Sequence, residues 1–351
     1  MRYARIGLLF SLASLVLTTA GVCQEIFEKD GLYTTGELTV STCIGSQKKL
    51  VIQAAASLSG RVEIGTTQQP EITVTYTKQS KTDNRSKAID YIDLVSISLD
   101  SLPEYIRLQL RAPNPAPWDK EIESGMIVAL VTVPEDFFVE VKATYFDVTA
   151  RGPLTGLVVP SSLGRMDVSH VDGRLELSTA NRRVKLEDIR GIISVSTTNS
   201  SIVAREITSD RGVAKFRNDG GDIKIMGLRG EANVKNRYGR ISIVDFRPRG
   251  ESSFIRGSSG PIILEISEMS SGQLVVSNRH EDIEITIPDT LQAFFSLAVS
   301  EEGMIEVTNF PFKTDLVQRD RLNLLAGDGP VEISGSIRGR GNIYIRGIRG
   351  D

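Results

Sequence analysis

The sequence predicts an all-β protein whose second half is a right-handed parallel β-helix of about 20-residue coils, and the main evidence is an internal repeat. Six units of 18 to 22 residues begin at glycines and place apolar or small residues two and four positions further on. Apolar residues at alternate positions indicate strands, and a fixed period indicates a stack of equivalent coils. The units begin at Gly173, Gly191, Gly212, Gly230, Gly250 and Gly272.

Each unit has the same internal order: an apolar pair, a small or polar corner residue, and a second apolar pair. In the fourth unit these are Ala232 and Val234, then Asn236, then Ile241 and Ile243. In the fifth unit the same spacing assigns Ser252 and Phe254 to the interior and Arg256 to the corner. Glycine permits positive φ at corners, and asparagine suits a left-handed corner. Because a single coil cannot cover both rims of its apolar layer, the units are expected to fold only as an array.

An antiparallel meander is the alternative architecture. The apolar pairs also recur every 9 to 10 residues, which fits one strand and one turn. The longer register of glycine starts and asparagine corners favours the parallel β-helix. The composition, with 31 glycines and 6% aromatic residues, fits either all-β form.

Residues 1–20 have the features of a secretory signal peptide. Arg2 and Arg5 provide a charged start, an apolar run of about 12 residues follows, and Thr18 and Ala20 form an acceptable cleavage site. The run is too short to span a membrane, and no later stretch reaches 18 apolar residues. We therefore expect a secreted or periplasmic protein of the cell envelope, with no transmembrane segment in the mature chain.

The two cysteines, Cys23 and Cys43, allow a disulfide if cleavage follows Ala20, because the exported chain meets an oxidising compartment. Two alternatives remain open. Cys23 follows Val22 where a lipobox has Gly or Ala, so it is a weak candidate for acylation. The cysteines can also be a signal-region residue and one structural thiol.

We predict two domains. Residues 21–150 form an N-terminal β domain, which is a sandwich or a cap on the first coil, and residues 151–351 form the β-helix. The N-terminal strands alternate without the 20-residue register, as in Ile72, Val74 and Tyr76. Trp118, the one tryptophan, lies in a proline-rich loop. It is expected to clamp that loop to the domain rather than to form a carbohydrate platform. The final strands, over residues 327–347, are expected to close the array.

These features together resemble a bacterial family of putative adhesins, secreted β-strand-repeat proteins of unassigned function. The resemblance rests on the secretory start, the segment Val74 to Lys78 before a charged loop, the recurrent Gly-Xaa-Ile-Xaa-Ile units, and the closing segment from Gly327 to Gly347. It covers roughly residues 38–348. The resemblance implies an extracytoplasmic β-helix without established enzyme activity, and it assigns no functional residues.

Catalytic and metal-binding patterns are sparse in the sequence. The two histidines, His170 and His280, are about 110 residues apart at outward or corner positions, so we expect neither a triad nor a metal site. No phosphate-binding loop, dinucleotide fingerprint or calcium nonapeptide occurs, so no cofactor is expected. The carboxylates that a polysaccharide lyase or hydrolase would use are Asp219 with Asp222, or Glu281 with Asp282 and Glu284. Solubility of the turns explains these acids better than catalysis does.

Among the residues expected to face outward, a recurring Arg-Gly pair at the start of the units is the best candidate for a binding site. Arg190, Arg211, Arg229 and Arg249 each precede a unit-starting glycine, so a parallel β-helix would stack them in a ladder along one edge. Such a ladder suits a repeating polyanion such as an acidic envelope polysaccharide. Alternatively, Asp188, Asp210 and Asp245 neutralise the arginines and the ladder has no ligand.

The function that the sequence favours is therefore a non-enzymatic scaffold or adhesin-like binding module at the cell envelope. Its expected partner is an envelope polysaccharide or an envelope protein, and not nucleic acid. Two alternatives are kept: an accessory protein in envelope-stress signalling, and an enzyme acting on polysaccharide.

Overall fold

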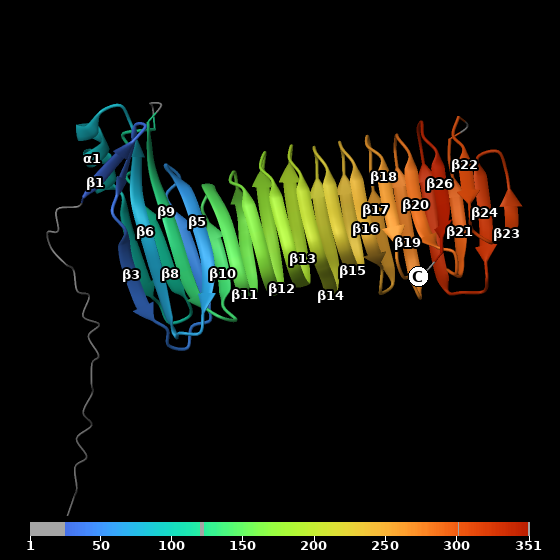
Figure 1. Ribbon diagram of the computed structural model, residues 1–351, viewed down its shortest axis with the longest axis horizontal. Coiled ribbons are helices and arrows are strands. Elements are labelled where there is room, and N and C mark those ends of the chain that lie inside the picture. The colour runs from blue at the N-terminus through green and yellow to red at the C-terminus, as the bar shows by residue number, and fades with distance from the viewer. Residues whose placement is uncertain (1–24, 120–122, 301, 350–351) are drawn as a thin grey trace, which may run out of the picture.

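The protein is an elongated all-β rod, seen in a computed structural model that describes residues 25–119, 123–300 and 302–349 (Figure 1). All of its strands belong to one network of pairings. The predicted signal peptide and Cys23 lie outside the described residues. Within the described residues, no helix is long and apolar enough to cross a membrane.

The N-terminal part mixes parallel and antiparallel pairing. Its elements are β1 (Ile26–Lys29), β2 (Leu32–Thr35), β3 (Leu38–Cys43), β4 (Lys49–Ala54), β5 (Leu58–Thr67), β6 (Glu71–Lys81), α1 (Arg85–Leu94), β7 (Ser96–Ser101), β8 (Ile106–Arg111), β9 (Ser124–Pro134) and β10 (Phe138–Lys142). Strands β3, β6 and β9 pair antiparallel, whereas β5 runs parallel to β9 and β4 parallel to β8 and β10. Helix α1 begins after Asn84, whose side chain accepts hydrogen bonds from the backbone N–H groups of Ser86 and Lys87.

The central array consists of parallel strands stacked along the rod. They are β11 (Tyr145–Ser162), β12 (Met166–Ala180), β13 (Val184–Thr198), β14 (Ile202–Asn218), β15 (Ile223–Asn236), β16 (Ile241–Arg247), β17 (Ser252–Arg256), β18 (Ile262–Ile266), β19 (Gly272–Asn278) and β20 (Ile283–Pro288). Leu186 pairs in parallel with Ala204 and Ile202 with Ile223, offsets of 18 and 21 residues. The parallel direction excludes the antiparallel meander.

Strand β11 joins the two parts. It runs through residue 150 and pairs in parallel with β5 and β10 of the N-terminal part and with β12 of the array. Hydrogen bonding is thus continuous across the predicted domain boundary, and the N-terminal strands cover the first coil as a cap would. A division into two domains stays a prediction.

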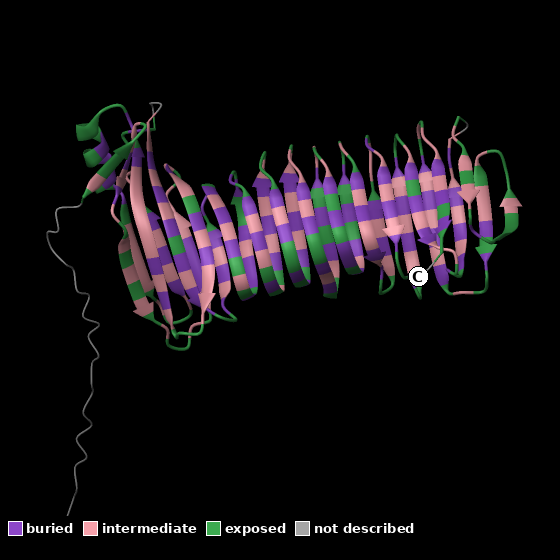
Figure 2. Cartoon of the chain, in the orientation of Figure 1, coloured by how far each residue is buried: buried purple, intermediate pink, exposed green. Residues whose placement is uncertain are grey.

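The long strands of the array contain residues with positive φ part-way along their length. They include His170 in β12, Asp188 in β13, Glu206 in β14 and Gly227 in β15. On both sides of these residues, buried and exposed residues alternate, as the bands in Figure 2 show. The predicted inward residues of the fourth unit, including Ile241 and Ile243, are fully buried.

The predicted register of the fifth unit is wrong by one residue. Ser253 and Ile255 are buried, whereas Ser252 and Phe254 lie on the outer face. Lys235 pairs with Arg256, so the corner opposite Asn236 is Gly257 and not Arg256. The sequence Ser-Ser-Phe-Ile-Arg permits both alternations, and the longer connection before it removes the local clue to register.

The predicted position of the last strands is also corrected. The C-terminal elements are β21 (Ala293–Ala298), β22 (Ile305–Thr308), β23 (Lys313–Val317), β24 (Arg321–Ala326), β25 (Val331–Ile337) and β26 (Ile343–Ile348). Strand β25 pairs in parallel with both β19 and β21, and β26 with both β20 and β22, so they insert between two earlier coils (Figure 1). The far end of the rod is formed by β21 to β24 instead, where β24 pairs antiparallel with β21 and β23.

Candidate functional site

The predicted arginine ladder is only partly regular. Arg190 pairs with Thr208, which pairs with Arg229, so these two arginines share a row two strands apart. The next residue in that row is Arg247. Arg211 lies where the register between β14 and its neighbours shifts, and Arg249 lies in the connection between β16 and β17. The four arginines therefore gather near one edge without forming a single stack.

Acidic side chains accompany the arginines of this edge. Arg190 bonds to Asp210 at 2.7 Å through both Nε and Nη2, and the hydrogen bond holds the pKa of the Asp210 carboxyl below its usual value. Arg211 lies 3.0 Å from Asp172, and Arg249 lies 3.6 Å from Glu268. These are the ion pairs of this edge: Arg190 with Asp210, Arg211 with Asp172 and Asp210, Arg247 with Asp245, and Arg249 with Glu268.

The prediction that Asp188, Asp210 and Asp245 neutralise the four arginines is correct in part. Asp210 pairs with two of the predicted arginines, but Asp245 bonds to Arg247, and Asp188 approaches His170 at 3.7 Å. A depression of 600 Å³ at this edge is lined by arginines and also by Asp210 and Glu231. Its charge is therefore largely compensated. Binding of a ligand by the four arginines stays a prediction.

A second cationic row lies on the broad face of the array. Arg217 pairs with Lys235, and Lys235 pairs with Arg256, so three cations occupy the same outward position on β14, β15 and β17. The row continues through Ser277 on β19 and Ser336 on β25. Like charges at directly opposite positions destabilise a sheet. Arg217 also lies 3.8 Å from Asp219.

Beside this row is a basic depression, which we define by four cations: Lys235, Arg256, Arg279 and Arg338. Its volume is 530 Å³, and its remaining lining residues are Asn236, Gly257, Ser258, Val275, Ser277, Asn278 and Ser336. No lining residue is acidic, and all belong to the described part of the chain. None of the four cations has a carboxylate of a described residue within 4.0 Å. All four side chains are exposed.

Buried asparagines form corners beside the basic depression, and the corner between two of them is a glycine. Asn218, Asn236 and Asn278 are buried corner residues whose amide groups donate to backbone carbonyls of the turns. Between Asn236 and Asn278 the corner residue is Gly257, where an added Cβ would lie 2.7 Å from the Asn278 Oδ1. Asn236 differs from its neighbours, because its buried Oδ1 has no hydrogen-bond partner among the described residues.

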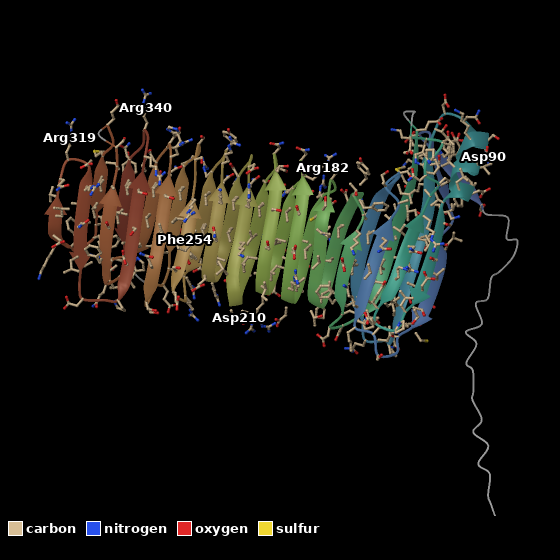
Figure 3. The ribbon with its side chains drawn as sticks, turned by 180° about the vertical axis from the view of Figure 1, so that it is seen from behind. Asp90, Arg182, Asp210, Phe254, Arg319 and Arg340 are labelled. Carbon is tan, nitrogen blue, oxygen red and sulfur yellow. The ribbon has the colours of Figure 1, made fainter. Side chains whose placement is uncertain are left out.

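Apolar side chains adjoin the cationic row. Phe254 pairs with Val275 in the neighbouring outward row, and the Arg256 guanidinium lies 5.3 Å from the centre of the Phe254 ring. Figure 3 places Phe254 on the broad face, between the edge of Asp210 and the opposite edge, which carries Arg182 and Arg340. The face therefore offers both cations and an apolar surface.

The candidate catalytic groups do not assemble into a site. His170 and His280 are exposed and belong to different coils, as expected. Asp222 accepts a hydrogen bond from the backbone N–H of Arg240, and Asp282 accepts one from that of Asn342, so these carboxylates hold turns. Among the described residues, no group of three His, Cys, Asp or Glu side chains is arranged to hold a metal ion.

Trp118 clamps its loop, as predicted. Its side chain is 4% exposed, its Nε1 donates to the Ser57 carbonyl at 2.8 Å, and its ring meets Tyr91 edge-on. Cys43 is exposed at the end of β3. Because Cys23 lies outside the described residues, the disulfide stays a prediction.

Sequence reasoning missed the basic depression because it misplaced the fifth unit. A usable signal was nevertheless present: a cation directly precedes the corner residue in Arg217-Asn218, Lys235-Asn236 and Arg256-Gly257. Aligning the units on that dipeptide would have superimposed the three cations.

Comparison with known proteins gives structural matches at low similarity. No family model and no curated protein matches the chain. Solved structures similar to it include a putative adhesin from Parabacteroides merdae, 10% identical with a TM-score of 0.30, covering 88% of this chain and 95% of that one. A putative adhesin from Bacteroides fragilis gives 10% identity and a TM-score of 0.30, over 88% and 97% of the two chains. A putative lipid binding protein from Parabacteroides distasonis is 11% identical with a TM-score of 0.30, and the match covers 88% of this chain and 96% of that one.

Two of these structures carry the description, putative adhesin, of the family that the sequence resembles.

Proposed function

We propose that the protein is an extracytoplasmic, non-enzymatic binding module of the cell envelope, which holds polyanionic polymers on a right-handed parallel β-helix in the manner of an adhesin. One observation carries the proposal: the basic depression brings together Lys235, Arg256, Arg279 and Arg338 without an acidic residue among its lining. The other arginine-rich edge is compensated by Asp172, Asp210, Asp245 and Glu268, so the proposal favours the depression over the ladder.

The physical basis is multivalent attraction. Four exposed cations contributed by separate strands and turns engage one polymer at several points, and each further contact is intramolecular once the first has formed. Exposed charges are screened by salt, so affinity should fall steeply as ionic strength rises. A rigid array suits this role, because ladder hydrogen bonds fix the spacing of the cations before the ligand arrives.

A binding role is favoured over an enzymatic one by the placement of the carboxylates. Glycoside hydrolysis needs two carboxyl groups facing each other across the substrate bond. Asp222 and Asp282 instead bond to backbone N–H groups of neighbouring turns. The predicted signal peptide in residues 1–20 supports the extracytoplasmic location.

The test is a binding screen of the purified mature protein against envelope polymers, run with a turnover assay on the same polymers. The panel contains acidic and neutral polysaccharides and polyphosphate, each at low and at physiological salt. We expect salt-sensitive binding of acidic polymers and no change in polymer length. Preference for neutral glycans, or binding that is insensitive to salt, would remove the polyanion proposal. Shortening of a polymer would instead support the enzyme.

A further inference from the structure

We infer that the ligand of the basic depression is a linear acidic polysaccharide that lies along the axis of the rod, with one acidic group over each coil. This inference rests on the proposed function and specifies its substrate class and orientation. Three features of the face support it: the register of the cations, the apolar surface beside them, and the concave surface of the basic depression.

The register of the cations sets the orientation. Arg217, Lys235 and Arg256 occupy one row on adjacent parallel strands. Neighbouring strands are about 4.8 Å apart, so the cations repeat at that spacing along the rod. This is close to the length of one sugar ring in an extended polysaccharide. A polymer crossing the rod at right angles would meet only one member of the row.

The apolar surface beside the cations favours a sugar polymer over polyphosphate. Phe254 and Val275 are half-buried neighbours in the adjoining row, and Arg256 lies over the Phe254 ring. Sugar rings present C–H faces that pack on aromatic and aliphatic side chains, whereas a polyphosphate has no such face. The arrangement of cations on one side and apolar groups on the other matches a ring with one carboxylate or sulfate substituent.

The basic depression gives part of the polymer a concave surface. The corners beside it hold the buried side chains of Asn236 and Asn278. Gly257 between them leaves no room for a Cβ, because that atom would lie 2.7 Å from the Asn278 Oδ1, so the backbone itself lines the depression there. Arg279 and Arg338 stand at the same depression from the turns beyond it.

Two variants of equal charge test the location. The first replaces the four cations of the depression: Lys235→Gln, Arg256→Gln, Arg279→Gln and Arg338→Gln. The control replaces the four edge arginines: Arg190→Gln, Arg211→Gln, Arg229→Gln and Arg249→Gln. The probe is a set of oligogalacturonates of defined length, with affinity measured by titration calorimetry at low salt.

We expect the depression variant to lose at least about tenfold in affinity, equal to 1.4 kcal/mol, and the edge variant to lose far less. The edge variant should also melt lower, since it breaks ion pairs, whereas the depression variant removes like-charge repulsion and should not. Affinity should rise with oligomer length until the chain spans β14 to β25 and then level off. Equal losses in the two variants, or no dependence on length, would overturn the inference.

One further variant tests the sugar character without changing charge. Phe254→Ala should weaken oligogalacturonate binding about three- to tenfold while leaving polyphosphate binding unchanged. If polyphosphate binds more tightly than oligogalacturonate and Phe254→Ala affects neither, the ligand is a polyphosphate and the inference is wrong. If no acidic polymer binds the unmodified protein, the proposed function itself fails.

Discussion

Replacing Ile243 by Asp should destabilise the array far more than the same change at its neighbour Ser242. Ile243 is fully buried on β16 and stacks between Ile225 and Leu264 of the flanking coils. Ser242 points outward in the row of Lys224 and Ile263 and is half-buried. The two positions are adjacent on one strand and face opposite sides, so the pair compares the same introduced charge inside and outside the array.

The size of the effect follows from what each side chain contacts. Truncation of a buried isoleucine to alanine costs about 2–5 kcal/mol, through lost transfer free energy and the cavity that remains. Aspartate at Ile243 adds the desolvation of a carboxylate with apolar neighbours, so its cost should be at least about 4 kcal/mol. Aspartate at Ser242 lies beside Lys224, and this opposite-charge pair limits the change to within about 1 kcal/mol.

The assay is thermal unfolding of the purified variants, followed by far-ultraviolet circular dichroism, with Ile243→Ala as an intermediate. At about 2–4 °C per kcal/mol, Ile243→Ala should lower the melting temperature by roughly 5–15 °C, and Ile243→Asp by more. Ser242→Asp should stay within about 4 °C of the unmodified protein. Equal melting of the two aspartate variants would refute the assigned inward face, and a dominant helical signal would refute the all-β fold.

Two other predictions concern specific contacts. Glu140 bonds to Lys142 and Lys49 at 2.8 and 2.7 Å, and these hydrogen bonds lower the pKa of its carboxyl below the ordinary value of 4.5. Because the pKa of this carboxyl is lower in the folded state, its ionisation stabilises the fold at pH values above 4.5, and that stabilisation is lost as the pH falls through the folded-state pKa. Glu140→Gln should therefore be less stable than the unmodified protein at neutral pH and equally stable under strongly acidic conditions. Urea titrations at several pH values measure this, and a difference in the free energy of unfolding that grows as the pH falls would contradict it. Asn278→Ala should cost about 2–3 kcal/mol, because it strips donors from the Gly260 and Glu281 carbonyls, whereas the exposed Asn233→Ala should cost under about 0.5 kcal/mol. Equal melting of the two alanine variants would show that the corner amides are dispensable.

Local pattern was sufficient for the features that depend on neighbouring residues. Alternation in Ile241 and Ile243 encodes which side faces the interior, because a strand turns successive side chains to opposite faces. The glycine period encodes the stack, and the proline-rich setting of Trp118 encodes a residue that anchors a loop.

The local pattern did not predict which residues face inward where the odd-numbered and even-numbered positions of a strand are equally apolar. Ser252 to Ile255 can be read in either phase, and a one-residue slip exchanges every inward and outward side chain. The pairing of Lys235 with Arg256 decides the phase, and that pairing joins residues 21 positions apart. The error placed Phe254 in the core and hid the basic depression.

Short-range periodicity was therefore sufficient to predict a β-rich, repetitive chain and to predict, at most positions of its units, which residues face the interior. Three features required the three-dimensional structure: β25 and β26 insert between earlier coils, the edge arginines meet Asp172, Asp210 and Glu268, and the pairing of Lys235 with Arg256 brings cations together in the basic depression. Each of these depends on which distant strands become neighbours, and many alternative pairings satisfy the same apolar pattern until the coils stack.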